Sequence, residues 1–155
     1  MTQLTRWSTA LLTLLLGLLA SVAGLGQSSS PVGVWVDDSA NTHIEIFSCG
    51  KKELCGKLVW LRPTSDSTAT ARQPQLDVHN PDAAKRQTPL LHLRILRGLR
   101  YNTNDERWED GEIYDPNNGR TYSCYLRLHS KNRLEVKGYI GFPLLGRSHY
   151  WTRLR

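Results

Sequence analysis

The sequence predicts an all-β protein in which about eight antiparallel strands close into an up-and-down barrel. After Pro31, short runs alternate between apolar and polar residues, which is the period of a half-buried strand. Turn residues separate these runs at short intervals, so consecutive strands are expected to pair with each other. Closure into a barrel removes exposed strand edges. A sandwich of two sheets is the alternative architecture.

The strands are expected at 32–36, 43–47, 54–61, 94–99, 107–114, 122–128, 134–140 and 144–154. Alternation places Leu58 and Trp60 on one face of their strand, and Leu126 and Leu128 on one face of theirs. A tight turn is predicted at 115–119, because proline presets one φ angle and the Asn-Gly pair tolerates positive φ.

The connection 63–92 is long, polar and poor in alternation. Its first half, from Thr64 to Thr70, is expected to be a mobile loop tip, and its second half is expected to be ordered. A short helix is predicted with Asn80 as N-cap and Pro81 at the first helical position. Asp77 and Asp82 are interpreted as capping and turn residues, not as ligands.

The N-terminal segment 1–26 has the three parts of a secretory signal peptide. Arg6 precedes an uncharged run from Trp7 to Gly24, and Ser21 and Ala23 fit a small-x-small cleavage site. A membrane anchor is the alternative, but the strongly apolar part is a little short for a span. We therefore expect one β-domain at 27–155, exported to the periplasm or the extracellular space, with no transmembrane segment after cleavage.

The net charge and the distribution of basic residues limit the classes of binding partner that the sequence favours. Without the signal peptide, 19 basic residues face 14 acidic ones, a net charge of about +5. This excess favours anionic surfaces, but the basic residues are spread along the chain, which argues against nucleic acid. An envelope protein is the other candidate partner.

The cysteines are Cys49, Cys55 and Cys124. A turn-like stretch separates the first two, so strand ends could bring them to bridging distance in an oxidising compartment. A disulfide is favoured over a metal site, which needs more soft ligands. Cys124 lies on the apolar side of its strand and is expected to be a buried thiol.

Several motifs together resemble a bacterial family of unknown function, numbered 2147. They are Gly33-Val34-Trp35, Leu54-Cys55-Gly56-Lys57-Leu58-Val59-Trp60-Leu61, Trp108-Glu109-Asp110-Gly111-Glu112-Ile113-Tyr114-Asp115-Pro116, Gly138-Tyr139-Ile140-Gly141 and Trp151-Thr152-Arg153. The resemblance implies an exported protein with a lipocalin-like β-barrel, and it implies no agreed activity. The sequence departs from the family pattern at His92, where a glycine is expected, and at 64–72, which is longer than usual.

The Gly33-x-Trp35 motif also resembles the opening of lipocalins, in which an arginine of the last strand covers the tryptophan. The candidates for this arginine are Arg147 and Arg153, and such a pair is a structural lock stabilised by a cation–π contact. An unrelated core tryptophan is the alternative interpretation.

Four aromatic residues are the candidate ligand-binding residues, namely Trp60, Trp108, Tyr114 and Tyr122. Aromatic walls inside a small barrel would suit a small apolar or amphipathic molecule, whereas ordinary strand packing explains them equally well.

No catalytic residue, cofactor or metal site is predicted. Six acidic residues gather between positions 105 and 115, but strand alternation separates them and turn chemistry explains most of them. The histidines lack the paired spacing of zinc proteases, and no serine lies in a Gly-x-Ser-x-Gly motif. The first functional hypothesis is therefore non-enzymatic binding of a small ligand. The alternative is an envelope interaction or structural module with a fully packed barrel, in which Trp60, Leu126, Leu128 and Val136 would plug the interior.

Overall fold

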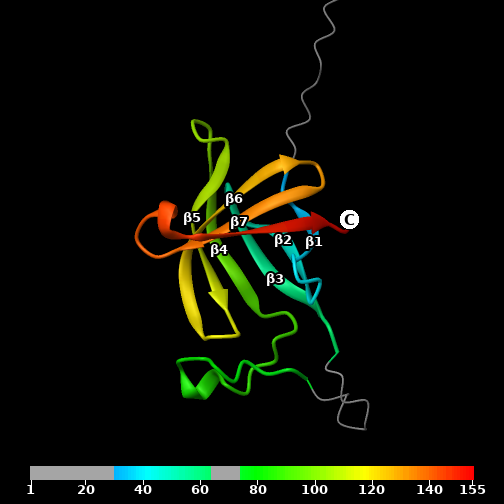
Figure 1. Ribbon diagram of the computed structural model, residues 1–155. Coiled ribbons are helices and arrows are strands. Elements are labelled where there is room, and N and C mark those ends of the chain that lie inside the picture. The colour runs from blue at the N-terminus through cyan, green and yellow to red at the C-terminus, as the bar shows by residue number, and fades with distance from the viewer. Residues whose placement is uncertain (1–29, 64–73) are drawn as a thin grey trace, which may run out of the picture.

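The computed structural model describes residues 30–63 and 74–155, which form one closed antiparallel barrel in the strand order β1 to β8 (Figure 1). The predicted eight-stranded up-and-down barrel is confirmed. The predicted signal peptide and the loop tip at 64–70 lie outside the described residues. Within the described part, no helix has the length and apolar character needed to cross a membrane.

The strands fall where the alternation places them, and most extend further into the turns than predicted. Their bounds are β1 Gly33–Val36, β2 Thr42–Gly50, β3 Glu53–Leu61, β4 Arg94–Asn102, β5 Arg107–Asp115, β6 Arg120–Ser130, β7 Arg133–Tyr139 and β8 Arg147–Arg153. The last prediction began too early, because Pro143–Leu145 forms a 3-10 turn, η3, ahead of β8. Proline has no N–H for a strand ladder, and its fixed φ suits the first position of a helical turn.

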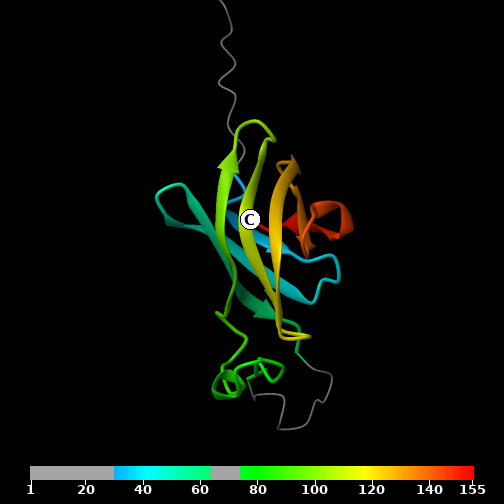
Figure 2. The same cartoon turned by 90° about the vertical axis from the view of Figure 1, so that its left-hand side faces the viewer.

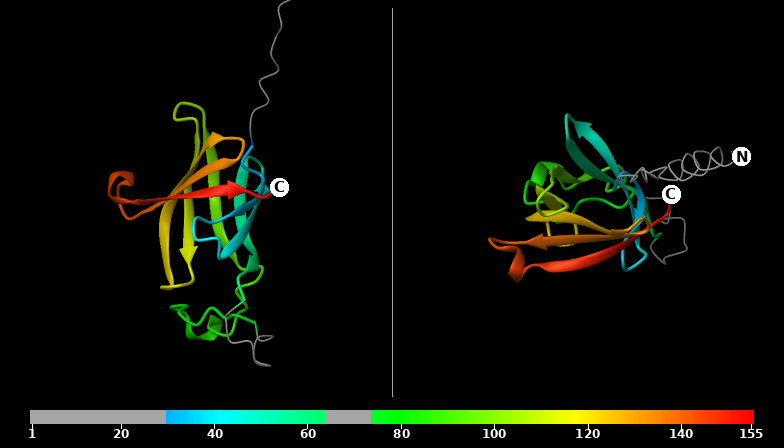
Figure 3. Two further views of the ribbon diagram at one scale, coloured as in Figure 1. Left: turned by 45° about the vertical axis from the view of Figure 1, so that its right-hand side comes forward. Right: turned by 90° about the horizontal axis from the view of Figure 1, so that it is seen from above.

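Consecutive strands pair antiparallel, so the connections alternate between the two ends of the barrel. One end, the long-connection end, carries 37–41, 62–93, 116–119 and 140–146. The other, the terminal end, carries the tight turns 51–52, 103–106 and 131–132, together with the start of β1 and the end of β8. Figure 3 shows the barrel from the side and along a perpendicular direction.

The barrel closes between its first and last strands, where β1 pairs with β8 at Trp35↔Arg153 and Val36↔Thr152. The Arg153 guanidinium lies over the Trp35 ring, 4.2 Å from its centroid. Its nitrogens also donate to the carbonyl oxygens of Val32 (2.8 Å), Ser30 (2.8 Å) and Lys131 (2.6 Å). A single side chain therefore joins the N-terminal approach, the β6–β7 turn and the tryptophan.

Trp35 is fully buried, and its indole N–H donates to the carbonyl of Pro31 at 2.7 Å. Gly33 leaves room for the arginine, since a Cβ atom there would lie 2.6 Å from Nη1 of Arg153 and 2.7 Å from the carbonyl oxygen of Arg155. Its φ of +140° also favours glycine. Arg147, the other candidate, lies at the exposed start of β8.

The interior is filled by apolar side chains from every strand. The fully buried ones include Trp35, Ile44, Ile46, Leu96, Leu99, Leu126, Leu134 and Val136. Two glycines make room for leucine side chains of the neighbouring strand, β4: a Cβ at Gly111 would lie 2.5 Å from the Leu99 side chain, and one at Gly56 would lie 2.8 Å from that of Leu96. Leu96 and Leu99 therefore fill the space beside these glycines, and this part of the interior is packed.

The second half of the long connection is ordered, as predicted, and it runs below the barrel in Figures 1 and 2. The short helix is a 3-10 turn, η2 (Ala83–Lys85), and its N-cap is Asp82, not Asn80. Asp82 Oδ1 accepts the backbone N–H of Ala84 at 3.1 Å, whereas Asn80 Oδ1 accepts that of Asp82. Asn80 thus forms the preceding turn.

His92 has a φ of 69°, in the left-handed region that favours glycine. Its N–H donates to the carbonyl of Leu58 at 2.7 Å, and the N–H of Leu58 donates to Leu93 at 3.0 Å. These bonds dock the end of the connection on β3. The left-handed backbone at position 92 explains why a glycine is expected there.

Arg153→Met should lower the free energy of unfolding by about 2 kcal/mol, because it removes the cation–π contact and three charge-assisted hydrogen bonds. Urea titration measures the change, with Arg147→Met as the matched control at an exposed position, which should change little. Equal effects of the two substitutions would contradict the lock.

Gly111→Ala should destabilise the barrel by about 1–3 kcal/mol through overpacking against Leu99. Gly138→Ala is the control, since its Cβ would meet only Ile113 at 3.5 Å and Tyr122 at 3.7 Å, which are ordinary contacts. Thermal unfolding of both variants tests how tightly the interior is packed. If Gly111→Ala is tolerated as well as Gly138→Ala, the interior has spare room.

Candidate functional site

The four residues proposed to plug the barrel are not all inside it. Leu126 and Val136 are buried, and Leu128 is partly buried against the core. Trp60 is 37 % exposed and stacks on His43, with the ring centroids 4.4 Å apart. The prediction that Trp60 shares a face with Leu58 is therefore wrong.

A β-bulge in β3 explains the position of Trp60. Ile44 pairs with Leu58 and His43 pairs with Trp60, so β3 has one extra residue, Val59, between two consecutive pairs. One inserted residue moves the following side chain to the other face of the sheet. Periodicity alone contains no signal for such an insertion.

The four predicted ligand-binding aromatics do not converge on one cavity. Trp60 faces the outside, and Trp108 is partly buried at the terminal end, where its ring lies 4.7 Å from that of Tyr101. Tyr114 and Tyr122 lie toward the long-connection end, on β5 and β6. Tyr122 is half-buried, and its hydroxyl accepts a hydrogen bond from Asn118 at 3.1 Å.

Tyr114 fastens the long connection to the barrel. Its hydroxyl donates to Oδ1 of Asp77 at 2.7 Å, and the side-chain amide of Asn80 donates to Oδ2 of Asp77 at 2.6 Å. Asp77 is fully buried. Burial, and next the hydrogen bond and negative charge of Asp77, raise the pKa of Tyr114 to about 12. The turn interpretation of Asp77 missed this buried role.

The turn 116–119 holds the same connection from the other side. Gly119 has a φ of +70°, and a Cβ atom there would collide with the carbonyl oxygen of His79. This close approach allows only glycine. The Asn-Gly signal therefore marks both a hairpin turn, as predicted, and a docking point for the long connection.

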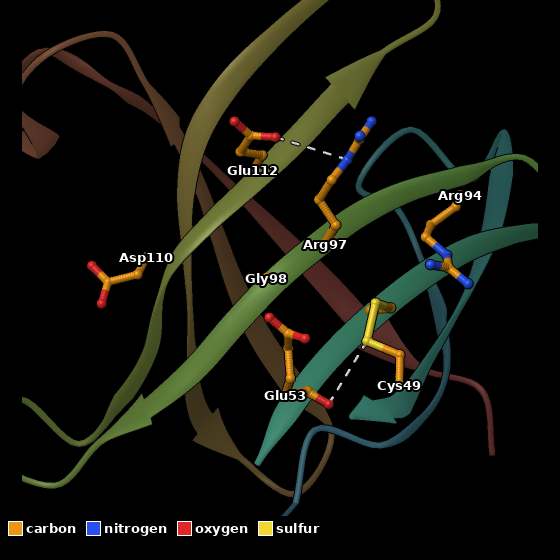
Figure 4. Close-up of a pocket in the computed structure, with 8 residues that line it drawn as sticks. Cys49, Glu53, Arg94, Arg97, Gly98, Asp110 and Glu112 are labelled. Atoms are coloured by element: carbon orange, nitrogen blue, oxygen red, sulfur yellow. Dashed lines mark hydrogen bonds and ion pairs between the residues drawn. A yellow bond between two sulfur atoms is a disulfide. The ribbon is translucent and has the colours of Figure 1, made fainter. Parts of the chain in front are cut away.

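An open pocket of about 390 Å³ lies beside the disulfide and is lined by residues of β2 to β5 (Figure 4). The lining residues are Cys49, Glu53, Cys55, Arg94, Arg97, Gly98, Asp110 and Glu112. The predicted disulfide is confirmed, with 5.8 Å between the Cα atoms of Cys49 and Cys55. The lining carries both positive and negative side chains, and Nε of Arg97 lies 3.8 Å from Oε2 of Glu112. Such a lining suits a polar or charged partner better than an apolar one.

A second polar cluster lies on β6, β7 and β8 around the buried Glu135. Its carboxylate accepts hydrogen bonds from Ser148 (2.7 Å) and Tyr125 (3.2 Å), and Nε2 of His129 lies 3.0 Å away. Burial alone would raise the pKa of Glu135, but these hydrogen bonds outweigh it and lower the pKa. A carboxylate of lowered pKa is a weak base, and Ser148 contacts it directly, without an intervening histidine. The shared carboxylate holds the three strands together.

Cys124 is fully buried, as predicted, and burial raises the pKa of its thiol to about 12. The thiol is therefore protonated at neutral pH and unreactive. In the described part of the chain, no three His, Cys, Asp or Glu side chains gather as metal ligands.

Tyr114→Phe should lower the free energy of unfolding by about 1–2 kcal/mol at neutral pH, because Asp77 stays buried with one hydrogen bond fewer. The folded pKa of Tyr114 lies above its ordinary value of 10. Its contribution is therefore complete below pH 10 and is lost as the pH rises toward about 12. Denaturant titration across this interval should show a smaller loss in the Phe variant. Tyr101→Phe, at a half-exposed ring, serves as control. Equal losses of unfolding free energy in the two variants would contradict the role of the hydrogen bond between Tyr114 and Asp77.

The comparisons with known proteins agree with this architecture. Protein HP1028 from the human pathogen Helicobacter pylori, described as belonging to the lipocalin family, has a similar structure. The TM-score is 0.66 at 18 % sequence identity, over 81 % of this chain and 84 % of that one. At this identity the likeness shows the fold alone. No curated protein matches the sequence. Residues 33–153 match the family described as "Uncharacterized protein conserved in bacteria (DUF2147)", and the chain therefore belongs to that family.

Proposed function

We propose that this protein is an exported, non-enzymatic envelope module that acts through its outer surface and not by enclosing a ligand. The observation that carries the proposal is the packed interior. Leu96 and Leu99 occupy the space above Gly56 and Gly111, and Leu126 and Val136 are buried with them. A ligand pocket usually needs several hundred cubic ångströms of space.

The arrangement of polar groups supports the non-enzymatic part of the proposal. The buried carboxylates of Asp77 and Glu135 are each engaged by neighbouring side chains. The one free thiol in the described residues is buried. These groups stabilise the barrel and its long connection.

Export is supported by the uncharged N-terminal run ending in small residues and by the Cys49–Cys55 disulfide, a bond typical of oxidising compartments. Since the family is described as bacterial, the compartment proposed is the periplasm or the extracellular space.

Binding of a small apolar or amphipathic molecule is the second candidate, favoured by the lipocalin-like fold. The half-buried Tyr122, toward the long-connection end, is the predicted aromatic best placed to meet such a molecule. The molecule would have to bind at this end, away from the leucines that fill the interior beside Gly56 and Gly111.

Native mass spectrometry of protein secreted to the periplasm separates the two candidates. The expected result is an unliganded mass, also after exposure to lipid extracts, with the chain starting near residue 24–27. Leu126→Ala is the positive control, because deleting a fully buried side chain leaves a cavity that apolar molecules can fill. A stoichiometric small molecule on the wild-type chain, weakened by Tyr122→Ala, would overturn the packed-barrel proposal.

A further inference from the structure

The connection between β7 and β8, residues 140–146, presents a continuous apolar surface to solvent. We call it the apolar loop. Its four large apolar side chains are the most exposed large hydrophobic residues of the described part, namely Ile140 (71 %), Phe142 (74 %), Leu144 (88 %) and Leu145 (78 %). Single exposed apolar residues are common on proteins, but a contiguous group marks an interaction site.

The backbone holds this loop in a defined, projecting shape. The η3 turn begins at Pro143, and the N–H groups of Phe142, Leu145 and Gly146 donate within the loop at 3.0–3.1 Å. Gly146 packs against the β7 backbone, since a Cβ there would lie 2.5 Å from the carbonyl oxygen of Gly138. In Figures 1, 2 and 3 the loop, coloured orange to red, stands out from the side of the barrel.

This construction suits an environment without water. Backbone N–H groups that already have partners do not lose hydrogen bonds when water is removed. The four side chains can therefore leave water while these three N–H groups stay bonded, which favours shallow insertion into a lipid interface.

The charged residues next to the loop along the chain are of one sign. From Val136 to the C-terminus there is no Asp or Glu. Arg147 is exposed at the first position of β8, and it pairs across the ladder with Gly138, next to Lys137. Cations beside an exposed apolar tip complement the headgroups of an anionic bilayer.

A second protein molecule fits the loop less well. A stable interface buries roughly 1,200–2,000 Å² in total, far more than seven residues on a projecting turn provide. A bilayer interface has no such requirement, because a few apolar side chains and cations suffice for reversible binding.

We propose that the apolar loop inserts into the surface of an anionic lipid bilayer, with Arg147 and Lys137 against the headgroups. This inference rests on the proposed function only in that the barrel acts through its outer surface. It names the partner of that surface as a membrane.

Sedimentation with lipid vesicles tests the proposal on the whole exported chain. Wild type should bind vesicles of equal parts phosphatidylglycerol and phosphatidylcholine, and it should bind pure phosphatidylcholine much more weakly. The double variant Leu144→Ser/Leu145→Ser should lose about tenfold or more in partitioning, because two apolar side chains no longer enter the bilayer. Arg147→Gln should lose several-fold on anionic vesicles only.

Leu91→Ser is the matched control, since Leu91 is an exposed leucine (45 %) on the long connection. It should bind like wild type. Unfolding titrations establish that every variant is folded. Absence of binding to both vesicle types, equal binding to both, or equal loss in Leu91→Ser would each overturn the proposal. A dimer that the double variant abolishes would overturn it in favour of self-association.

These outcomes remain separate from those of native mass spectrometry. A chain that is unliganded but ignores vesicles refutes the membrane partner and leaves the packed-barrel proposal standing. A chain that carries an internal ligand and still binds vesicles refutes the packed-barrel proposal and leaves the membrane partner standing.

Discussion

The contact between Arg153 and Trp35 is the constraint on which the rest of this barrel depends. Strand β1 has only four residues and pairs with β8 at two positions, and the backbone of Val34 also exchanges hydrogen bonds with Leu154 and Arg155. The guanidinium adds a cation–π contact and reaches three backbone carbonyls. Closure places Trp35 in the core, and the interior side chains of the other strands pack around it.

The packed interior favours the proposal that this protein acts through its outer surface. The glycines at 56 and 111 admit leucines where a cavity-forming barrel would leave space. The polar groups that remain serve the scaffold: Tyr114 and Asp77 hold the long connection, and Glu135 joins three strands. The exposed features are a pocket of mixed charge beside the disulfide and a projecting apolar loop. Both lie on the outside of the barrel.

Alternation and turn chemistry were enough to predict the eight strands and their order, because period two and tight turns are local properties of the chain. The disulfide followed from spacing in the same way. Three features depended on tertiary structure. The bulge at Val59 turned Trp60 outward, Asp77 became a buried anchor through a partner 37 positions away, and the N-cap of η2 is Asp82 in place of Asn80. Proline at 143 signalled a break, but exposure of the following leucines follows from the path of the chain in space and not from its pattern.

The third cysteine has a consequence for how the chain acquires its bridge. Three thiols allow three pairings, and two of them would involve Cys124. Cys49 and Cys55 are separated by 6 positions, whereas Cys124 is 69 or more positions from either. Chain-closure entropy alone makes the short ring roughly forty times easier to form in an unfolded chain. Once the barrel forms, burial removes Cys124 from reach of oxidants. The native pairing is thus selected by proximity before folding and by burial afterwards, which lets an odd number of cysteines coexist with one defined covalent structure.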